Sequence, residues 1–437
     1  MTYGIVKKMQ KIKDNVFWVV YYVILLILII IPFYYSHNYW TQFFFARSLP
    51  LKHKILLDIS RVSLLIIATL MVFFRNQIYN KRREIFLFLF TFIFCFILLE
   101  ISSRYYVCNF AEPEIQSNVL LYDEFKMCGL KSRYSPHPYL NDYGTPNFRT
   151  SDGLDMHNSL GFRGPEIEIP KPSGRYRIVI LGGSSAYESG VYEWKKDFAR
   201  QLEKELRVLY NTENIEVINA ALPGYTSYEN LINLELKVLD LKPDMVIIYE
   251  GVNDFASRLV NPENYHGDNT GLAKQWDPPK TPIVLKSMFV RLIIGNPIGV
   301  GNFLNPPDFL YGTTEEKILE ALEKNPPIYF KRNLENMVVL SNYRNATVLL
   351  STWAHSDEFG DLTSSYAYEK GYEEMNVVVK EVGAENNVLV YDFVKDMPKD
   401  KKYWVDGRHV NDAGAELKGK LFAEYIYKND LVSYEIR

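Results

Sequence analysis

The sequence predicts an α/β domain built on a parallel sheet and preceded by a membrane region. From about residue 177 onward, short apolar runs rich in β-branched residues alternate with amphipathic stretches, a pattern typical of a parallel sheet with helices on both faces. Polar motifs that contain glycine follow several of these runs. The first hundred residues differ, because they contain long apolar runs of the kind that cross a bilayer.

The composition excludes several classes of function. The chain has 437 residues, of which 48% are hydrophobic, enough for a large core beside a membrane region. The net charge is -3 with acidic and basic residues mixed, so the chain lacks the basic footprint of a nucleic-acid-binding protein. Neither a Cys-x-x-Cys pair nor a His-x-x-x-His spacing is present, which argues against a zinc site.

Three apolar runs predict transmembrane helices within residues 1–102. The runs cover residues 16–35, 55–74 and 85–101. A cleaved signal peptide fits the first run poorly, because no small-residue cleavage site follows it and two more apolar runs do. Asp58 and Arg61 interrupt the second run three residues apart, where they can pair on one helix face. The third run is short for a span, and a buried or interfacial helix is the alternative.

Basic residues that flank the runs predict their orientation. They cluster before the first run and between the second and third, at Lys7, Lys8, Lys11, Lys13, Arg75, Lys81, Arg82 and Arg83. Such clusters stay on the cytoplasmic side, so three spans put the N-terminus inside and everything after about residue 102 outside the cytoplasm. Outside, Cys108 and Cys128 are able to form a disulfide. Two unrelated thiols are the alternative, because spacing does not fix geometry.

Residues 103–170 and 171–437 have different characters. The first segment is rich in Tyr, Asn, Pro and Asp and shows little periodicity, so we expect an irregular extracytoplasmic segment laid against the domain. In the second, apolar runs predict five strands at residues 177–181, 215–219, 245–249, 347–351 and 388–391. Helical stretches are expected near residues 197–209, 228–239 and 413–427.

An insertion at about residues 256–335 interrupts this alternation. It is rich in proline, with aromatic residues and glycines between the prolines. Loops this long in a compact domain are usually functional or disordered. We expect a rim or lid of the active site, and a packed structural excursion is the alternative.

Gly182-Gly183-Ser184 follows the first predicted strand directly and leads toward a helix. Glycines let the chain turn sharply there, and the helix N-terminus supplies backbone N–H groups and the positive end of a dipole. Ser184 can present its hydroxyl as a nucleophile while its own N–H faces a developing oxyanion. A phosphate-binding turn is the alternative, but Gly-x-Gly-x-x-Gly and a P-loop lysine are absent. The elbow Gly-x-Ser-x-Gly is also absent, because Ala186 occupies its last position.

Two further motifs can supply oxyanion donors. Gly224 lies in Leu-Pro-Gly-Tyr after the second strand, and Asn253 lies in Gly-Val-Asn-Asp after the third. The amide of Asn253 can donate to an oxyanion without titrating. A plain loop glycine and a turn-forming Asn-Asp pair are the alternatives for the two motifs taken alone.

Asp406 and His409 stand three residues apart, just before the last predicted helix. This spacing places a carboxylate beside an imidazole and fixes the tautomer whose other nitrogen accepts a serine proton. His355 is the chief rival as base, but no comparable carboxylate accompanies it. Ligands on parallel sheets bind beyond the carboxyl ends of the strands, so we expect the four motifs to converge there as one serine-nucleophile site.

Together the motifs resemble those of the SGNH (GDSL-type) hydrolase superfamily, over about residues 175–427. The four marker residues of that family are Ser, Gly, Asn and His, and its His belongs to an Asp-x-x-His pair. They match Ser184, Gly224, Asn253, His409 and Asp406 of this chain. The resemblance implies a flavodoxin-like five-stranded sheet with strand order 2-1-3-4-5.

The resemblance also implies roles for these residues. Ser184 is then the nucleophile, His409 the base and Asp406 its orienting partner. The oxyanion donors are then the Ser184 N–H, the Gly224 N–H and the Asn253 amide. The chain departs from the commonest family motif at Gly183, where that motif has Asp, which loosens the assignment to a subfamily.

The sequence thus favours a membrane-anchored serine esterase acting on an O-acyl ester outside the cytoplasm. Attack by Ser184 and proton transfer by His409 need no metal and no organic cofactor. One alternative is an O-acyltransferase that delivers the acyl group to a cell-envelope glycan or lipid, as relatives of this fold do. The other is a non-catalytic glycan-binding scaffold.

Overall fold

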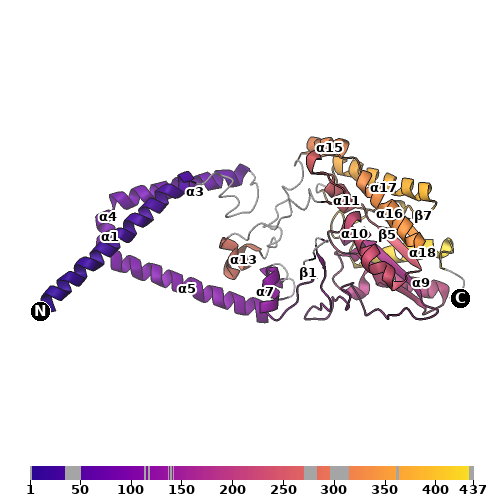
Figure 1. The fold of residues 1–437 in the computed structure, drawn as a ribbon, viewed down its shortest axis with the longest axis horizontal. Coiled ribbons are helices and arrows are strands. Elements are labelled where there is room, and N and C mark those ends of the chain that lie inside the picture. Colours follow the sequence, from indigo (N-terminus) through magenta and orange to yellow (C-terminus); the bar gives the residue numbers. More distant parts are fainter. Residues whose placement is uncertain are drawn as a thin grey trace. The chain divides into compact units, whose positions relative to one another are not determined.

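The computed structural model describes residues 2–34, 51–112, 115–116, 119–135, 137, 140, 142–269, 283–295, 314–360 and 364–432. The chain falls into two units (Figure 1), one formed by Met1–Leu120 with Pro278–Asp308 and the other by Leu121–Asp277 with Phe309–Arg437. We call the first the helical unit and the second the α/β unit.

The helical unit is built from long and short helices. The long helices are α1 (Thr2–Tyr34), α3 (Leu51–Phe73) and α5 (Arg82–Asn109), and the short ones are α4 (Arg75–Asn80) and α13 (Met288–Gly295). Among the described residues, two stretches are long and apolar enough to cross a membrane, Lys11–Ile30 and Arg82–Asn109. The run at 85–101 therefore lies within a helix of 28 residues, which as a whole is long and apolar enough to cross a membrane.

The run at 55–74 also lies in a helix, α3, which contains the apolar stretch Arg61–Phe73. Asp58 and Arg61 pair as their spacing predicts, with 3.3 Å between Arg61 Nη1 and Asp58 Oδ1. The count of three spans and their orientation stay predictions.

The α/β unit is organised around one five-stranded sheet. Its strands are β3 (Tyr176–Gly182), β4 (Ile215–Asn219), β5 (Met245–Tyr249), β6 (Thr347–Ser351) and β7 (Leu389–Tyr391). All neighbouring pairs are parallel, and the order β4-β3-β5-β6-β7 is 2-1-3-4-5 along the chain. The predicted fold class is confirmed. The central strands β3 and β5 are buried along their whole length, as expected of strands that are continuous apolar runs.

Two groups of helices cover this sheet (Figure 1). α9 (Phe198–Tyr210) packs against α18 (Asp412–Lys428), whereas α10 (Ser227–Asn233), α16 (Ile328–Tyr343) and α17 (Tyr366–Asn386) pack on one another. Polar caps fix where α9 and α18 begin. The Asp197 carboxylate accepts the Arg200 N–H at 2.9 Å, and Asn411 Oδ1 accepts the Gly414 N–H at 3.0 Å.

Smaller elements complete the α/β unit. They are α7 (Tyr122–Met127), the strand pair β1 (Tyr134–Ser135) and β2 (Tyr143–Gly144), α8 (Ser184–Tyr187), α11 (Val252–Ser257) and α15 (Glu315–Lys324). The stretch expected as one helix at 228–239 is divided, because a π-helical turn and a 3-10 turn follow α10.

Residues 103–109 of the segment expected to be irregular belong to α5, whereas most of the described residues between α5 and β3 are irregular. Arg163 fastens the later part of this segment to the domain. Arg163 is buried and pairs with Asp155 at 3.0 Å. Its guanidinium also donates to four carbonyls at the end of α8 and in the loop that follows, at 2.7 to 3.0 Å, those of Tyr187, Glu188, Val191 and Tyr192. The segment therefore supports the chain just beyond Ser184.

The insertion is divided between the two units. Its residues 270–282 and 296–313 lie outside the described ranges. The described stretch between them, a 3-10 turn (Ile283–Lys286) and α13, belongs to the helical unit, whereas α15 and α16 return to the α/β unit. The sequence predicted a lid or a packed excursion and gave no sign of this attachment.

Candidate active site

Ser184 is the first residue of α8, directly after the turn at the carboxyl end of the central strand β3. Its hydroxyl oxygen lies 2.8 Å from Nε2 of His409. On the other side of the ring, Nδ1 of His409 lies 2.9 Å from Oδ2 of Asp406. The three side chains form one hydrogen-bonded series, in which the imidazole can take the serine proton and the carboxylate can stabilise the imidazolium.

A tight loop holds Asp406 and His409 together. Val405 donates its N–H to the His409 carbonyl at 2.9 Å and so closes the loop. Within it, Asp406 Oδ1 accepts the N–H groups of Arg408 and His409 at 2.7 and 2.8 Å. Partial burial on its own would raise the pKa of Asp406, but the hydrogen bond and charge of His409 and these two N–H groups lower that pKa to about 2. The carboxylate therefore stays ionised across the neutral range.

The predicted oxyanion donors come from the ends of neighbouring strands. Gly224 has φ +83°, a conformation that favours glycine. Over the part of the chain that the structure describes, neither the Ser184 N–H nor the Gly224 N–H meets a backbone acceptor in the loops. Asn253 Nδ2 donates to the Tyr225 carbonyl at 2.7 Å, so one of its two amide hydrogens links the two turns and the other remains for a ligand.

Gly183 makes room for the Asn253 amide. A Cβ at residue 183 would lie 2.3 Å from Asn253 Nδ2 and 3.0 Å from the carbonyl oxygen of Tyr225. A side chain there would displace the amide from its place beside the Ser184 turn. This gives a physical reason for the glycine that precedes Ser184 in this chain.

Removing the Asn253 amide should slow the chemical step. We expect Asn253→Ala to lower kcat by about 10²–10³-fold with little change in KM, because the donor acts mainly on the charge that develops in the transition state. Steady-state kinetics on a dissolved short-chain ester check this, with the exposed Asn261→Ala as matched control. An unchanged kcat in Asn253→Ala would remove this amide from the oxyanion site.

Two buried residues that the sequence analysis did not single out connect the two catalytic turns. Asn230 Oδ1 accepts the Gly182 N–H at 3.0 Å, and Asn230 Nδ2 donates to Glu250 Oε2 at 3.1 Å. Glu250 Oε1 in turn accepts the Gly251 N–H at 2.9 Å. The pair thus joins the chain before Ser184 to the chain before Asn253. The only hint in the sequence is a carboxylate placed directly after the wholly apolar strand β5.

Three buried carboxyl groups, those of Glu229, Glu250 and Asp254, lie around the start of α10 and α11. Asp254 accepts the N–H and the hydroxyl of Ser227 at 2.8 and 2.5 Å, which ties α11 to α10. Burial raises the pKa of Asp254 to about 7 even though these hydrogen bonds lower it, and burial also raises the pKa of Glu229 and of Glu250.

This cluster predicts that the protein becomes more stable as the pH falls from about 8 to about 5. A carboxyl whose pKa is higher in the folded state than its value of about 3.9 in the unfolded state binds its proton more tightly when folded, so stability falls as the pH rises toward about 7. The Tm of the detergent-solubilised protein across this range checks it. Asp254→Asn, which mimics the protonated acid, should flatten the curve. A wild-type Tm that rises with pH over this range would contradict the prediction.

His355, the rival base, and Ser185, the serine next to Ser184, have other partners. His355 Nε2 lies 2.9 Å from Glu369 Oε1, and the ring stacks on Trp353, so His355 has a carboxylate that sequence spacing did not reveal. It is His409 whose imidazole contacts the Ser184 hydroxyl. Ser185 donates to the Arg408 carbonyl at 3.1 Å and so holds the Asp406–His409 loop against the Ser184 turn.

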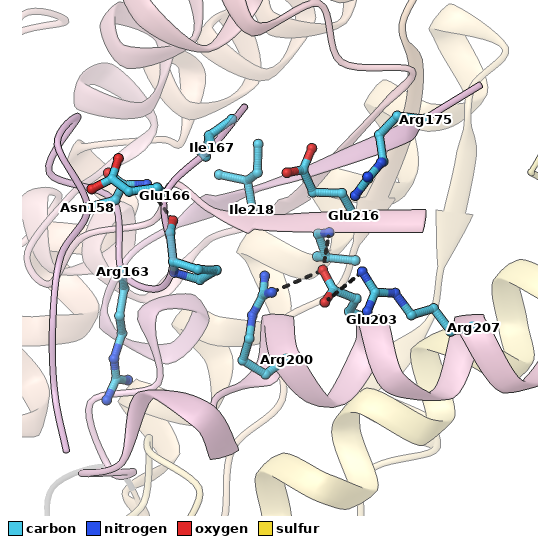
Figure 2. Close-up of a pocket in the computed structure, with 12 residues that line it drawn as sticks. Asn158, Arg163, Glu166, Ile167, Arg175, Arg200, Glu203, Arg207, Glu216 and Ile218 are labelled. Carbon is cyan, nitrogen blue, oxygen red and sulfur yellow. Dashed lines mark hydrogen bonds and ion pairs between the residues drawn. The ribbon is translucent and has the colours of Figure 1, made fainter. Parts of the chain in front are cut away.

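A separate cavity of about 190 Å³ lies along β4 (Figure 2). Arg200 and Arg207, both on α9, pair there with Glu203 at 3.0 and 3.2 Å. Its lining residues include neither Ser184 nor His409. Since β4 contributes its Glu216–Ile218 stretch rather than its carboxyl end, this cavity is distinct from the catalytic edge of the sheet.

One family model and several solved structures are similar to this chain. The model of the GDSL-like lipase/acylhydrolase family matches residues 180–417, more than half of the chain. Among solved structures, a lipase/acylhydrolase from Enterococcus faecalis is 22% identical, with 58% of this chain and 96% of that chain covered and a TM-score of 0.37. A GDSL-like lipase from Bacteroides thetaiotaomicron is 17% identical, with 60% and 93% covered and a TM-score of 0.35. No curated protein matches the chain.

The family model covers every strand end that carries a catalytic motif, from the turn after β3 to the start of α18. The sheet order is the one that the resemblance implied. The chain therefore belongs to the GDSL-like lipase/acylhydrolase family and is an ester-cleaving hydrolase.

Proposed function

We propose that the protein is a membrane-anchored, extracytoplasmic serine esterase that cleaves an O-acyl ester through an acyl-enzyme on Ser184. The observation that carries the catalytic part is the contact of 2.8 Å between the Ser184 hydroxyl and His409 Nε2, with Asp406 on the far side of the ring. The proposed reaction uses these side chains, the ester and water.

The reaction follows from these contacts. His409 Nε2 takes the Ser184 proton as the serine oxygen attacks the ester carbonyl, and the tetrahedral oxyanion is held by the N–H groups of Ser184 and Gly224 and by the Asn253 amide. Collapse breaks the ester C–O bond while His409 returns the proton to the leaving alcohol. Water, activated by the same imidazole, then releases the acid and regenerates the serine.

The experiment that tests hydrolysis uses the full chain in detergent and a panel of short- and long-chain acyl esters and acetylated glycans. We expect stoichiometric release of acid and alcohol, with a preferred acyl length that defines the substrate class. If no member of the panel is cleaved above the Ser184→Ala background, the esterase proposal fails.

An O-acyltransferase remains the second candidate, because the same acyl-enzyme can be resolved by a sugar or lipid hydroxyl in place of water. The panel separates the two when a glycan acceptor is added. Acylated acceptor at the expense of free acid would support transfer, whereas free acid alone counts against it. A scaffold that binds glycan without catalysis would release neither product.

The location outside the cytoplasm is proposed from three features of the chain. Its stretches Lys11–Ile30 and Arg82–Asn109 are long enough to span a bilayer. The basic residues in the first part of α1 and around the start of α5 favour a cytoplasmic location for those ends. A disulfide between Cys108 and Cys128, which the sequence allows, would suit an oxidising compartment, and Cys95 is free.

The disposition can be checked by thiol counting and protease protection. In sealed membrane vesicles oriented like the cell, protease added outside should remove the α/β unit, and two thiols should appear only after reduction. Protection of the α/β unit from external protease would place it in the cytoplasm and would overturn this part of the proposal.

A further inference from the structure

We infer that α13 is embedded in the outer leaflet of the membrane and that Glu100 docks it on the outer end of α5. The inference rests on the proposed insertion of α5 in a membrane. It concerns a stretch of the insertion that begins soon after Asn253 and that nothing in the catalytic mechanism uses.

The contact between α13 and α5 is made by one carboxylate. Glu100 of α5 accepts the N–H groups of Met288 and Phe289 at 3.0 and 3.1 Å and the hydroxyl of Ser287 at 2.7 Å. Arg104, one turn further along α5, donates to Glu100 at 2.7 Å and to the carbonyl of Lys286 at 3.1 Å.

With this contact, every backbone N–H group in the first turn of α13 has an acceptor. The next N–H, that of Val290, donates to the Ser287 hydroxyl at 3.3 Å, and the N–H of Arg291 donates to the Ser287 carbonyl at 3.1 Å. The first N–H groups of a helix have no partner within the helix, and water usually satisfies them at a surface. In lipid no water is available, so an element can enter only if its own protein supplies every partner. The start of α13 meets that condition.

The side chains of α13 are equally suited to lipid. Its sequence, MFVRLIIG, has one charged residue, Arg291, which is fully buried. The side chain of Ile293 is 61% exposed. Among the described residues, α5 itself buries only Ser103 and Val107, so most of the apolar surface of α5 lacks protein cover. An apolar surface that extends along a long helix needs a cover, and the bilayer proposed for α5 supplies it.

The direction of α13 follows from its aromatic contact. Glu100 ends the apolar run of α5, and Phe96 lies one turn before it, inside that run. The ring of Phe289 packs edge-on against Phe96, with 6.1 Å between centroids. α13 therefore starts at the charged boundary marked by Glu100 and Arg104 and passes alongside the apolar part of α5. With the C-terminal end of α5 outside the cytoplasm, this is the outer leaflet.

Depth-dependent quenching tests the inference on the full chain in phosphatidylcholine vesicles. A fluorophore is attached to Ile293→Cys in a Cys95→Ser background, and quenching by lipids with a spin label on the acyl chain is measured. The native Cys95, which is free and exposed on α5, is labelled alone as the lipid reference. Val339→Cys, 59% exposed on α16 of the α/β unit, is the aqueous reference.

We expect the probe at position 293 to be quenched to nearly the extent of the probe at Cys95, while the probe at 339 is unquenched. Quenching at Cys95 with none at 293 would overturn the inference and leave the membrane anchor standing. Absence of quenching at Cys95 would overturn the anchor itself, and the inference with it. Catalytic activity plays no part in either reading.

A second variant tests whether Glu100 docks α13 on α5. Glu100→Ala should reduce quenching at 293 several-fold and leave quenching at Cys95 unchanged, because α13 loses the acceptor for its first N–H groups. Glu84→Ala, an exposed carboxylate at the other end of α5, should change neither. Full quenching at 293 in Glu100→Ala would show that Glu100 does not dock the helix.

Discussion

Ser184→Ala should lower kcat/KM on any ester that the protein cleaves by about 10⁴–10⁶-fold, to the residual rate that binding and oxyanion donors alone provide. The reason is that the serine oxygen is the atom that bonds to the acyl carbon. The substitution removes one oxygen at a half-buried position, so the fold and Tm should change little. Circular dichroism and thermal melts distinguish a chemical defect from a folding defect.

The matched control is Ser189→Ala, five residues further along the same loop and exposed to solvent. Its kinetics should equal those of the wild type. If Ser184→Ala retained a substantial fraction of activity, another nucleophile would be at work and the assignment of Ser184 would be wrong. If both variants were inactive, a general disturbance of the turn after β3 would be the cause.

His409→Ala should cost about as much as Ser184→Ala, and the two losses should not add. A serine hydroxyl without its base is a poor nucleophile at neutral pH, and a base without its nucleophile has nothing to activate, so residues that act as a unit show strongly non-additive losses. The double variant Ser184→Ala/His409→Ala should therefore have the kcat of either single variant within error.

The control for this prediction is His355→Ala, whose imidazole pairs with Glu369. It should retain most of the activity, with at most a change in Tm. Single-turnover kinetics on an activated ester measure the acylation step directly for each variant. Multiplicative losses in the double variant would mean that Ser184 and His409 act independently, contrary to the hydrogen bond between them.

The sheet could be predicted from the sequence because its strands are unambiguous apolar runs. β4, β5 and β6 were predicted at the residues where they lie, and β3 differs by one residue at each end. Their order followed from the family resemblance rather than from periodicity. The same is true of the roles of Gly224 and Asn253, whose short motifs are ordinary turn sequences when taken alone.

The supporting contacts could not be predicted, since they depend on three-dimensional packing between distant parts of the chain. Asn230 and Glu250 stand 20 positions apart and become partners only when α10 lies beside the end of β5. Arg163 finds its four carbonyl acceptors in a loop that has no regular pattern. His355 lies in the loop after β6 and its partner, Glu369, lies on α17, so a rule based on spacing missed it.

In the membrane region, the sequence predicts the helices but neither their bounds nor their contacts with one another. Apolar length predicts helices well, but it does not show where a helix begins, and α5 starts before and ends after the predicted run. The attachment of α13 to α5 was invisible because one glutamate, Glu100, directs it across 188 positions of sequence. A polar residue that ends an apolar run is usually read only as the end of a span.

The central claim is that the acyl group is carried on the Ser184 oxygen. Mass spectrometry of proteolytic peptides after brief reaction with a fluorophosphonate tests it most directly, because the reagent traps only a serine activated as a nucleophile. The account predicts one modified peptide, with the adduct on Ser184, and no adduct in the His409→Ala protein. An adduct on a different serine, or labelling of Ser184 that does not need His409, would contradict it.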